Sequence, residues 1–351
     1  MSSNRTGFTT GTCAAAAAKA ATMVLCDMAR PEEVDVTLPD GSIVTLPLEM
    51  VEYNTSSASA SVRKNAGDDP DVTDGCLVSA SVRWNDGNEI TLLAGEGVGT
   101  VTKPGLSVPP GEPAINPVPR RMITDALKEV TQRAVQVIIS IPGGKELAQK
   151  TFNPRLGVEG GLSILGTSGI VRPFSSAALQ DALVCSLNVA VACDVRSPVF
   201  VPGRIGEKAA RKLFRTSGEQ VVEVSNEWEF MLDHAMNCNF DRLLVLGHPG
   251  KLAKLTIGYW DTHSSRSGSA VPAVMALAEK IFGQAPPERS TVEGIFRELD
   301  TTNQNKLADE LAADIRRKVS NRILNRFEVA VVLVNMTGEP LGQDGDTSAW
   351  Q

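Results

Sequence analysis

The stretch with the clearest capacity for binding chemistry is FNPRLGVEGGLSILGTSGIVRPFS, which begins at Phe152. Backbone N–H groups in a glycine-rich loop can approach a ligand closely, and such a loop before a helix is typical of sites for nucleotide-like molecules. A plain connection between domains is the alternative, but so dense a run exceeds the average glycine usage of about 7%. The residues that we assign to a cofactor here are Gly157, Gly160, Gly161, Gly166, Thr167, Ser168 and Gly169.

A second candidate site is LGHPGKLAKLTIGYWDTHSSRSG, which begins at Leu246. A buried strand is expected to end at Gly247, and the carboxyl end of a parallel strand is the usual ligand position in an α/β sheet. We therefore expect Gly247, His248 and Gly250 to contact the cofactor and Lys251 to contact the substrate. The stretch lacks the GxxxxGK[ST] spacing of a P-loop.

Three further clusters lie nearer the start of the chain. In TTGTCAAAAAKAA, Thr10 or Thr12 can cap an alanine-rich helix, whose first N–H groups would then attract an anion. A capped helix that is simply packed through small residues explains the alanines equally well. In RKNAGDDPDVTDG, Asp68, Asp69 and Asp71 repel one another unless a cation or hydrogen-bond donors lie nearby, although a solvated turn is the default.

The third of these clusters, GEGVGTVTKPG followed by GEPAINPVPRR, resembles a dinucleotide fingerprint only superficially. A strand and a proline turn are expected after its glycines, whereas the fingerprint requires a helix, so we reject it. What remains is a glycine-lined loop with polar and cationic side chains. Lys103, Asn116 and Arg120 are the candidates there for binding an anionic substrate.

The elements that would position these residues form two domains, at 1–155 and 156–351. Residues up to about 95 alternate apolar and polar side chains, with a hairpin signal at Asp40-Gly41, and predict an antiparallel sheet against the alanine-rich helix. The first domain is therefore an α+β layered sandwich. After Gly157, strands alternate with helices, which predicts a Rossmann-like α/β domain whose last strand spans about 327–335.

Bulk composition excludes some partners. A net charge of −7 and a pI near 5.2 disfavour nucleic acid, which requires a surplus of Lys and Arg. No stretch approaches the roughly 20 apolar residues of a membrane span, and no signal pattern is recognisable. The six cysteines are scattered, so neither a zinc site nor a disulfide framework is indicated. We expect a cytoplasmic protein with reduced thiols and no metal site of its own.

Taken together, the clusters resemble the cobalt-precorrin-5B C(1)-methyltransferase family of cobalamin biosynthesis. The resemblance rests on GFTTGTCAAAAAKAA, NAGDDPDVT, GEGVGTVTKPGL, EPAINPVPRRMI, IPGGKELAQKTFNPRLGVEGGLSILGTSGIVRPFS and GHPGKLAKLTIGYWDTHSSRS, within residues 6–266. It implies a methyltransferase that uses S-adenosyl-L-methionine to methylate carbon 1 of a tetrapyrrole. The cobalt would then travel with the substrate.

Given this resemblance, we expect the loop 157–169 and the turn 247–251 to hold the methyl donor. The acetate and propionate arms of the substrate would meet Lys103, Arg120, Arg155 and Arg172, since cations recognise carboxylates. Asp69 or His263 would accept a proton late in the reaction. Other enzymes of the pathway are candidate partners, and the sequence leaves the oligomeric state open.

Two alternatives remain from the sequence. One is a nucleotide-dependent enzyme that holds Mg²⁺ at the Asp68–Asp71 cluster. The other is a non-catalytic corrinoid carrier or scaffold.

Overall fold

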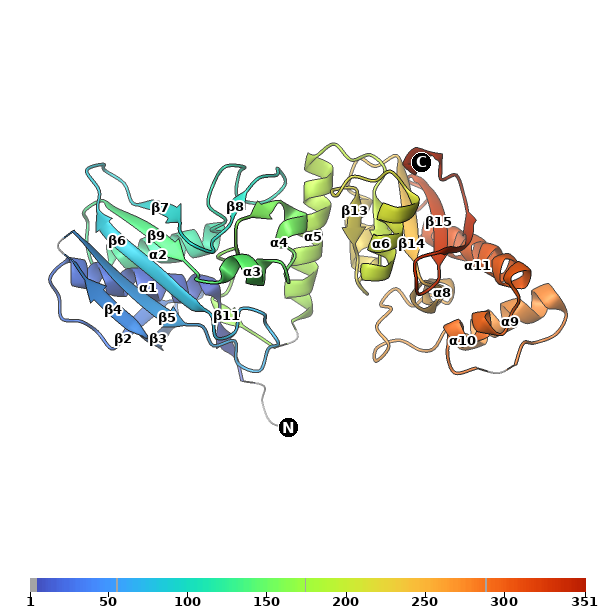
Figure 1. Ribbon diagram of the computed structural model, residues 1–351, viewed down its shortest axis with the longest axis horizontal. Helices are drawn as coiled ribbons and strands as arrows, with labels where there is room; N and C mark the ends of the chain where they lie inside the picture. The colour runs from blue at the N-terminus through green and yellow to red at the C-terminus, as the bar shows by residue number, and fades with distance from the viewer. Residues whose placement is uncertain (1–4, 55, 174, 288) are drawn as a thin grey trace. The chain divides into compact units, whose positions relative to one another are not determined.

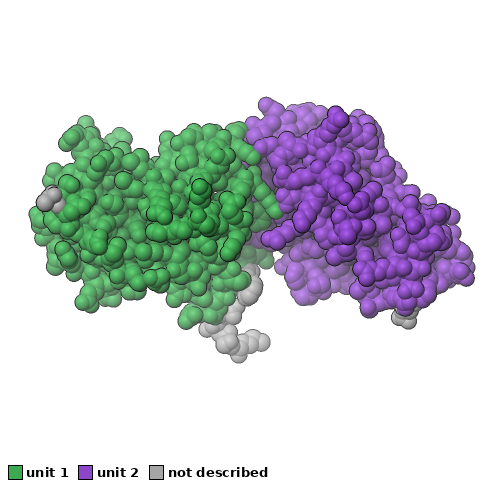
Figure 2. Space-filling model, in the orientation of Figure 1, with its two compact units in different colours: residues 1–176 green, residues 177–351 purple. Residues whose placement is uncertain are grey.

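The computed structural model describes residues 5–54, 56–173, 175–287 and 289–351. The chain forms two compact units, Met1–Ser176 and Ala177–Gln351, which Figure 2 colours separately. Each unit has its own sheet and its own helices (Figure 1). The fold is therefore mixed α/β, as the sequence predicts. Within the described residues, no helix is long and apolar enough to cross a membrane.

Unit 1 is built on a five-stranded sheet in the order β4-β5-β6-β9-β7. Its strands are β4 (Met50–Tyr53), β5 (Ser57–Arg63), β6 (Leu77–Trp84), β7 (Thr91–Ala94) and β9 (Val135–Ser140). All pairs are antiparallel except β7 with β9. The antiparallel pairing predicted for residues up to about 95 is confirmed, and the parallel pair includes β9, which lies beyond them. The chain between the two strands includes helix α2 (Pro117–Lys128), and such a crossover allows neighbouring strands to be parallel.

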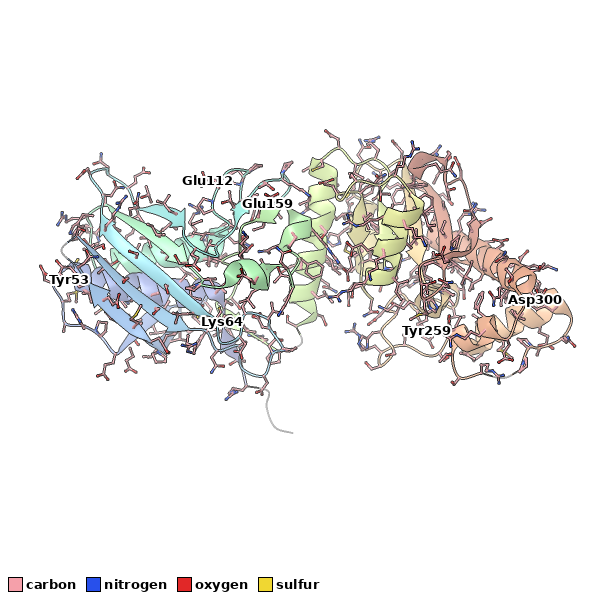
Figure 3. The ribbon with its side chains drawn as sticks, in the orientation of Figure 1. Tyr53, Lys64, Glu112, Glu159, Tyr259 and Asp300 are labelled. Atoms are coloured by element: carbon pink, nitrogen blue, oxygen red, sulfur yellow. The ribbon has the colours of Figure 1, made fainter. Side chains whose placement is uncertain are left out.

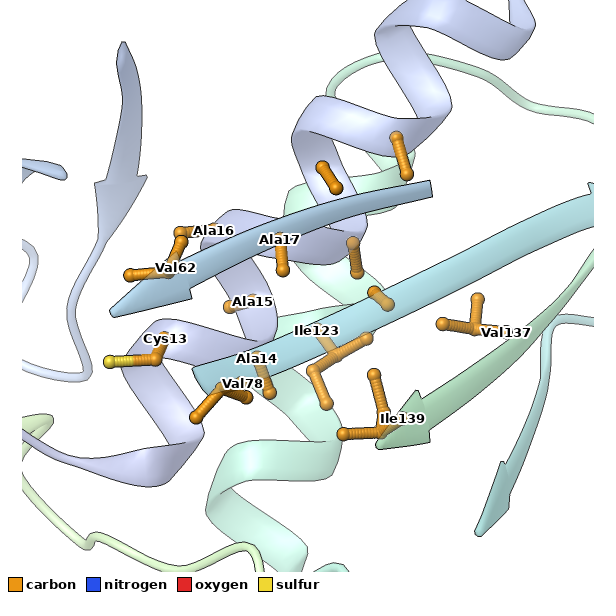
Figure 4. Packing of buried hydrophobic residues seen from close by; sticks show 14 of the residues in the cluster. Cys13, Ala14, Ala15, Ala16, Ala17, Val62, Val78, Ile123, Val137 and Ile139 are labelled. Atoms are coloured by element: carbon orange, nitrogen blue, oxygen red, sulfur yellow. The ribbon is translucent and has the colours of Figure 1, made fainter. Parts of the chain in front are cut away.

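Small side chains determine how α1 (Thr10–Leu25) packs on this sheet. Ala14 to Ala18 have no exposed surface, and alternate residues of β5 and β6, such as Ala60 and Ala80, are also buried. Figure 4 shows the alanines of α1 close to Val62 of β5 and Val78 of β6. Because a methyl group is the largest side chain that most of these helix positions carry, the helix axis can lie near the strands. The alanine run thus allows the helix to pack closely on the sheet.

Shorter elements complete unit 1. The hairpin of β2 (Glu33–Thr37) and β3 (Ile43–Pro47) turns at Asp40-Gly41, as predicted. Helices α3 (Gly144–Ala148) and α4 (Asn153–Leu156) follow β9. Strand β10 (Val158–Glu159) pairs with β8 (Thr100–Val101), and β11 (Ile170–Val171) pairs with β1 (Gly7–Phe8). These two pairings keep residues 156–171 in unit 1, so the compact unit extends beyond the boundary expected at 155.

Unit 2 contains a second five-stranded sheet in the order β13-β12-β14-β15-β16. The first four strands are parallel, and β16 is antiparallel to β15. The strands are β12 (Val199–Val201), β13 (Val221–Glu223), β14 (Arg242–Gly247), β15 (Glu328–Val334) and β16 (Pro340–Asp344). The strand expected at 327–335 is β15, which does return to the sheet. It is not the last strand, because the chain turns at Gly338 and adds β16 at the edge.

Helices alternate with the strands of unit 2 and bury both faces of its sheet. Leu244 and Leu246 pack in one apolar cluster with Ala209 of α6, while Leu243 and Val245 are buried on the other face. This follows from the two-residue period of a strand. The helices are α5 (Ser176–Ala192), α6 (Arg204–Leu213), α7 (Trp228–Ala235), α8 (Pro249–Thr256), α9 (Val271–Phe282), α10 (Val292–Arg297), α11 (Thr301–Arg322) and the 3₁₀ turn η1 (Ser348–Trp350).

The close approach of α1 to its sheet predicts that Ala17→Leu destabilises unit 1. Extra carbon atoms at a fully buried position force the helix outward, at a cost of about 1–3 kcal/mol. Urea unfolding followed by circular dichroism measures the loss. The matched control is Ala276→Leu, at an exposed position of α9. An unchanged unfolding midpoint for Ala17→Leu would contradict the packing argument.

Candidate functional site

The amino-terminal end of α1 brings together the predicted clusters of unit 1. Thr9, not Thr10 or Thr12, is the N-cap: its hydroxyl accepts a hydrogen bond from the Thr12 N–H at 3.2 Å. The prediction that Thr10 or Thr12 caps the helix is therefore wrong. Thr9 directly follows strand β1 and has an extended backbone. The helix therefore begins at Thr10, one residue earlier than a cap at Thr10 would place it.

Thr10 and Thr12 instead hold the glycine-rich segment against the helix. The Thr10 hydroxyl accepts from the Leu165 N–H at 3.0 Å, and the Thr12 hydroxyl donates to the Gly169 carbonyl at 2.6 Å. The N–H of Gly11 donates to the Leu165 carbonyl at 3.1 Å. Both threonines are buried, with 3% and 0% of their surfaces exposed. Carbonyl oxygens of the protein thus accept from the Gly11 N–H and the Thr12 hydroxyl, at the helix end where we expected a substrate carboxylate.

Most glycines of the segment are explained by close contacts between chain segments. A Cβ on Gly161 would lie 2.2 Å from the Gly97 carbonyl oxygen, and one on Gly144 would lie 2.3 Å from the same atom. Gly97 itself has a positive φ of 70°. Three segments therefore cross where none carries a side chain. We call this contact of Gly97, Gly144 and Gly161 the glycine crossing.

The remaining glycines of the segment differ in their surroundings. Side chains lie where a Cβ would project from Gly157, Gly166 and Gly169: Lys103, Thr9 and Leu38 respectively. Gly160 has no atom within 4 Å of such a Cβ and is exposed. Thr167 and Ser168 are exposed as well. Of the seven residues of this segment that we assigned to a cofactor, these three are the exposed ones.

The predicted cationic residues border this part of unit 1. The aliphatic stem of Lys103 lies over Gly157, and Arg120 forms an ion pair with Glu112 at 3.7 Å. The Arg155 guanidinium lies 5.7 Å from the centre of the Phe152 ring. Figure 3 labels Glu112 and Glu159, the carboxylates of the same neighbourhood.

Backbone bonds extend this neighbourhood to the start of α2. The Asn116 N–H donates to the Ile164 carbonyl, which joins α2 to the glycine-rich segment. Asn116 occupies the N-cap position of α2 without a hydrogen bond from its side chain to the helix. Arg172, next to β11, is exposed.

The acidic cluster is stabilised by donors from unit 1 itself. Lys64, only 2% exposed, forms an ion pair with Asp71 at 2.8 Å (Figure 3 labels Lys64). Asp68 accepts from the Arg5 N–H at 2.7 Å, and Asp74 accepts from the Ala66 N–H at 2.8 Å. Asp69, the predicted proton acceptor, is half-buried beside them. Across the described residues, no group of three His, Cys, Asp or Glu side chains is arranged to hold a metal ion.

Two buried cysteines near this cluster are poor nucleophiles. Burial raises the pKa of the Cys13 thiol to about 12 and that of the Cys76 thiol to about 11, although the Lys64 charge opposes both shifts. A thiol is reactive as its thiolate, so neither side chain is activated at neutral pH.

The second candidate site lies in unit 2, at the turn from β14 to α8. His248 is the N-cap of α8: its Nδ1 accepts from the Gly250 N–H at 3.0 Å, and its Nε2 lies 2.8 Å from a Glu293 carboxylate oxygen. An Nδ1 that accepts leaves the proton on Nε2, which donates to Glu293. Both ring nitrogens of His248 are thus engaged within unit 2, and the imidazole fixes the turn that contains Gly247 and Gly250.

Two residues that the sequence analysis did not single out, Gly203 and Glu223, lie opposite this turn. Lys251 Nζ donates to the Pro202 carbonyl at 3.4 Å, beside Gly203, which connects β12 to α6. Gly203 has a φ of 147°, and the only atom near a Cβ placed there would be Glu223 Oε1 at 3.8 Å. Glu223 ends β13 and is half-buried. The available signal was a G-x-x-G pattern directly after a strand, with an acidic residue about 20 positions later.

His263, the other predicted proton acceptor, is exposed in the loop after α8. Its Nδ1 accepts from the Ser265 hydroxyl at 2.8 Å. The loop is fastened by Lys254, which is 8% exposed and donates to the Thr262 carbonyl at 3.1 Å and the Ser267 hydroxyl at 2.9 Å. Lys254 therefore has a structural role.

A cavity of about 820 Å³ lies elsewhere in unit 2, at the amino-terminal ends of β14 and β15. Arg242 on its border pairs with Asp346 at 3.0 Å, and Arg316 pairs with Asp344. None of the predicted site residues borders it. Ligands of parallel sheets usually bind at the carboxyl ends of the strands, which form the opposite edge of this sheet.

The contacts of Thr12 predict a positioning effect. Thr12→Val removes the hydroxyl that donates to the Gly169 carbonyl, which should cost about 1 kcal/mol and speed amide exchange in residues 163–171. Hydrogen exchange followed by mass spectrometry measures this, with Thr45→Val on the exposed β3 strand as the control. Unchanged exchange together with weaker substrate binding would instead favour direct contact with a ligand.

The Lys64–Asp71 pair predicts a dependence on acidity. Burial alone would raise the pKa of Asp71, but hydrogen bonds from Lys64 and Thr73 outweigh it and hold that pKa below its usual 3.8. The stabilisation is thus complete above about pH 4 and is lost as the pH falls through the lower folded-state pKa. Asp71→Asn should destabilise the chain at pH 7 by about 3 kcal/mol, because it leaves the Lys64 charge buried without its carboxylate.

Urea unfolding at pH 3 to 7 tests this, with Asp68→Asn, an exposed partner of Arg5, as the control. The gap in stability between wild type and Asp71→Asn should narrow in acid. If the difference in stability stays constant across this range, the ion pair makes no contribution that depends on the protonation of Asp71.

Comparisons with known proteins match both ends of the chain. The family model CbiD matches residues 1–173, and the model for the CbiD C-terminal domain matches residues 261–345. A cobalt-precorrin-5B C(1)-methyltransferase from Syntrophotalea carbinolica is 53% identical over 345 residues, which cover 98% of each chain. The enzyme of that name from Ralstonia nicotianae is 41% identical over 97% of this chain and 94% of its own.

A crystal structure of a cobalamin biosynthesis protein (cbiD) from Archaeoglobus fulgidus is 30% identical and covers 75% of this chain and 83% of its own, with a TM-score of 0.41. Family membership rests on the sequence relatives, which extend through both compact units and include the clusters described above. The chain belongs to the CbiD family of cobalt-precorrin-5B C(1)-methyltransferases.

Proposed function

We propose that this chain transfers a methyl group from S-adenosyl-L-methionine to carbon 1 of cobalt-precorrin-5B, giving cobalt-precorrin-6A. The observation that carries the proposal is the 53% identity to an enzyme of that name across 98% of both chains. That the donor is S-adenosyl-L-methionine is a separate part of the proposal, because the names of the relatives give the reaction but not the donor.

The reaction suits residues that mainly position their ligands. The S–CH₃ bond of the sulfonium breaks as the C–CH₃ bond forms, and the donor leaves as a neutral thioether. Bringing the two reactants into line supplies much of the rate enhancement of such a displacement. The protein then needs two binding surfaces and one proton acceptor, for which Asp69 and His263 remain our candidates.

We assign the tetrapyrrole to the end of unit 1 beside the glycine crossing. Lys103, Arg120, Arg155 and Arg172 supply cations for its carboxylate arms, and Asn116 supplies a polar side chain at the start of α2. Thr10 and Thr12 act through the backbone they anchor. In the segment 157–169, which the sequence analysis assigned to the methyl donor, the exposed Gly160, Thr167 and Ser168 remain our candidates for ligand contacts, while the buried glycines maintain the chain path.

We assign the methyl donor to unit 2, which we propose is Rossmann-like. Its parallel strands in the order β13-β12-β14 place a change of direction between β12 and β14, where such sheets bind ligands. Gly247, Gly250 and Lys251 lie at that edge, and His248 holds their turn in place. A cytoplasmic location and other enzymes of the pathway as partners also remain proposals.

The structure does not favour the magnesium-dependent alternative. Asp71 is paired with Lys64, and Asp68 with Arg5, so these carboxylates already have cationic partners.

The test is anaerobic incubation of the full chain with cobalt-precorrin-5B and S-adenosyl-L-methionine, followed by mass spectrometry. We expect a product heavier by one CH₂ unit. Arg155→Gln should raise KM for the tetrapyrrole roughly 10-fold or more with a smaller change in kcat, because a charge-assisted hydrogen bond contributes about 1.5–3 kcal/mol. Arg83→Gln, exposed on β6, is the control.

Two results would contradict the proposal. Binding of the tetrapyrrole without methyl transfer would favour a carrier or scaffold. Equal KM values for Arg155→Gln and the control would remove Arg155 from the substrate site.

A further inference from the structure

The carboxyl ends of β12, β13 and β14 form an edge whose use the family relationship does not specify. Strand β13 pairs with one side of β12 and β14 with the other, so the chain reverses its direction of travel across the sheet at β12. The connections that follow neighbouring strands at such a point leave the sheet on opposite faces. In open parallel sheets, ligands bind outside the carboxyl ends of the strands at such a point.

Two glycines after β12 have different surroundings. A Cβ on Gly206 would lie 2.7 Å from the Leu246 carbonyl oxygen and 2.9 Å from the Val201 Cβ, so this glycine allows α6 to pack directly on the sheet. A Cβ on Gly203 would meet nothing nearer than Glu223 Oε1 at 3.8 Å. Close packing explains Gly206. Gly203 is favoured by its backbone φ of 147°, which side chains rarely allow, and its lack of a Cβ also leaves space beside the turn. At Gly203 the bare backbone faces open space, with a carboxylate across it.

The carboxylate that faces Gly203 lies close to a cationic side chain of unit 2. Glu223 is the last residue of β13, and Lys251 reaches the neighbouring Pro202 carbonyl from α8. Burial lowers the pKa of Lys251, while the charge of Glu223 opposes this shift, as expected for two groups close in space. An ionised carboxylate can only accept hydrogen bonds.

An ionised carboxylate beside bare backbone suits a particular chemical group. Its two oxygens can accept two O–H donors at once, as the vicinal hydroxyls of a ribose provide. Gly203 would allow the sugar to approach the β12–α6 turn without a steric clash. An amine or a guanidinium would also pair with a carboxylate, but neither requires the open backbone.

We propose that Glu223 binds the ribose hydroxyls of the adenosyl group of the methyl donor, with Gly203 as the backbone that the sugar approaches. This inference rests on the proposed function, because it assumes that the donor is an adenosyl compound. It adds a specificity-determining residue outside the stretches that the sequence pattern singled out. Glu223 does not take part in methyl transfer; it contacts the ligand away from the reacting sulfur.

Calorimetric titration of the full chain with S-adenosylhomocysteine and with its 2′-deoxyribose analogue tests the proposal. Wild type should bind the deoxy analogue roughly 10-fold or more weakly, as expected for loss of a hydrogen bond to a charged group. Glu223→Gln should weaken S-adenosylhomocysteine binding by a similar factor and should no longer distinguish the two ligands. Glu310→Gln, an exposed carboxylate on α11, should behave as wild type.

The outcomes separate the two claims. If wild type binds neither ligand, the adenosyl donor of the proposed function is wrong. If wild type binds both equally, or if Glu223→Gln retains the wild-type preference, the donor stands and the role of Glu223 is overturned. The analogue is compared on the unmodified chain, so the proposal can fail even if Glu223→Gln does not fold.

Discussion

The architecture of unit 1 depends on the close approach of backbone to backbone. At the glycine crossing, Gly97, Gly144 and Gly161 leave no room for a Cβ, and three segments distant in sequence meet there. The alanines of α1 allow a similarly short distance between a helix and its sheet. Interiors packed to this density relax little after substitution. Rigidity of this kind suits a surface that must hold a large substrate in one orientation.

Unit 2 uses a different principle to position its polar groups. Parallel strands end together, so the residues that follow them gather along one edge although they are far apart in sequence. Glu223, His248 and the Gly203 turn come from three different strands. The apolar residues of those strands are buried on both faces, which keeps the edge fixed.

Much of this fold follows from local pattern in the sequence. The two-residue alternation of β5 and β6 and the Asp40-Gly41 turn predicted the antiparallel part of the first sheet, and alternating strands and helices predicted the second. The parallel pairing of β7 with β9 was not predictable from local periodicity, since alternation does not encode strand direction. The added strand β16 escaped prediction because its residues PLGQD lack a strongly apolar face.

The candidate site was harder to predict because glycine has two uses that look the same in a sequence. The segment 157–169 was interpreted as a ligand loop from its glycine count, whereas Gly161 and Gly169 serve close contacts within the protein. Gly160 of the segment and Gly203, in a less conspicuous stretch, have open space beside them instead. Neighbours in space decide between the two uses, and only the structure supplies them.

The pairing of β1 with β11 has a consequence for how the chain reaches this fold during synthesis. Residues 7–12 make their contacts with residues 163–171, so unit 1 is closed by segments near its two ends. Helix α1 is made before residues 163–171, so the Leu165 carbonyl that accepts from its Gly11 N–H is missing until nearly the whole unit has been made. Contacts of such long range carry a large loop-closure entropy and form late. The first turn of the nascent α1 therefore gains these contacts only after residues 163–171 have been synthesised.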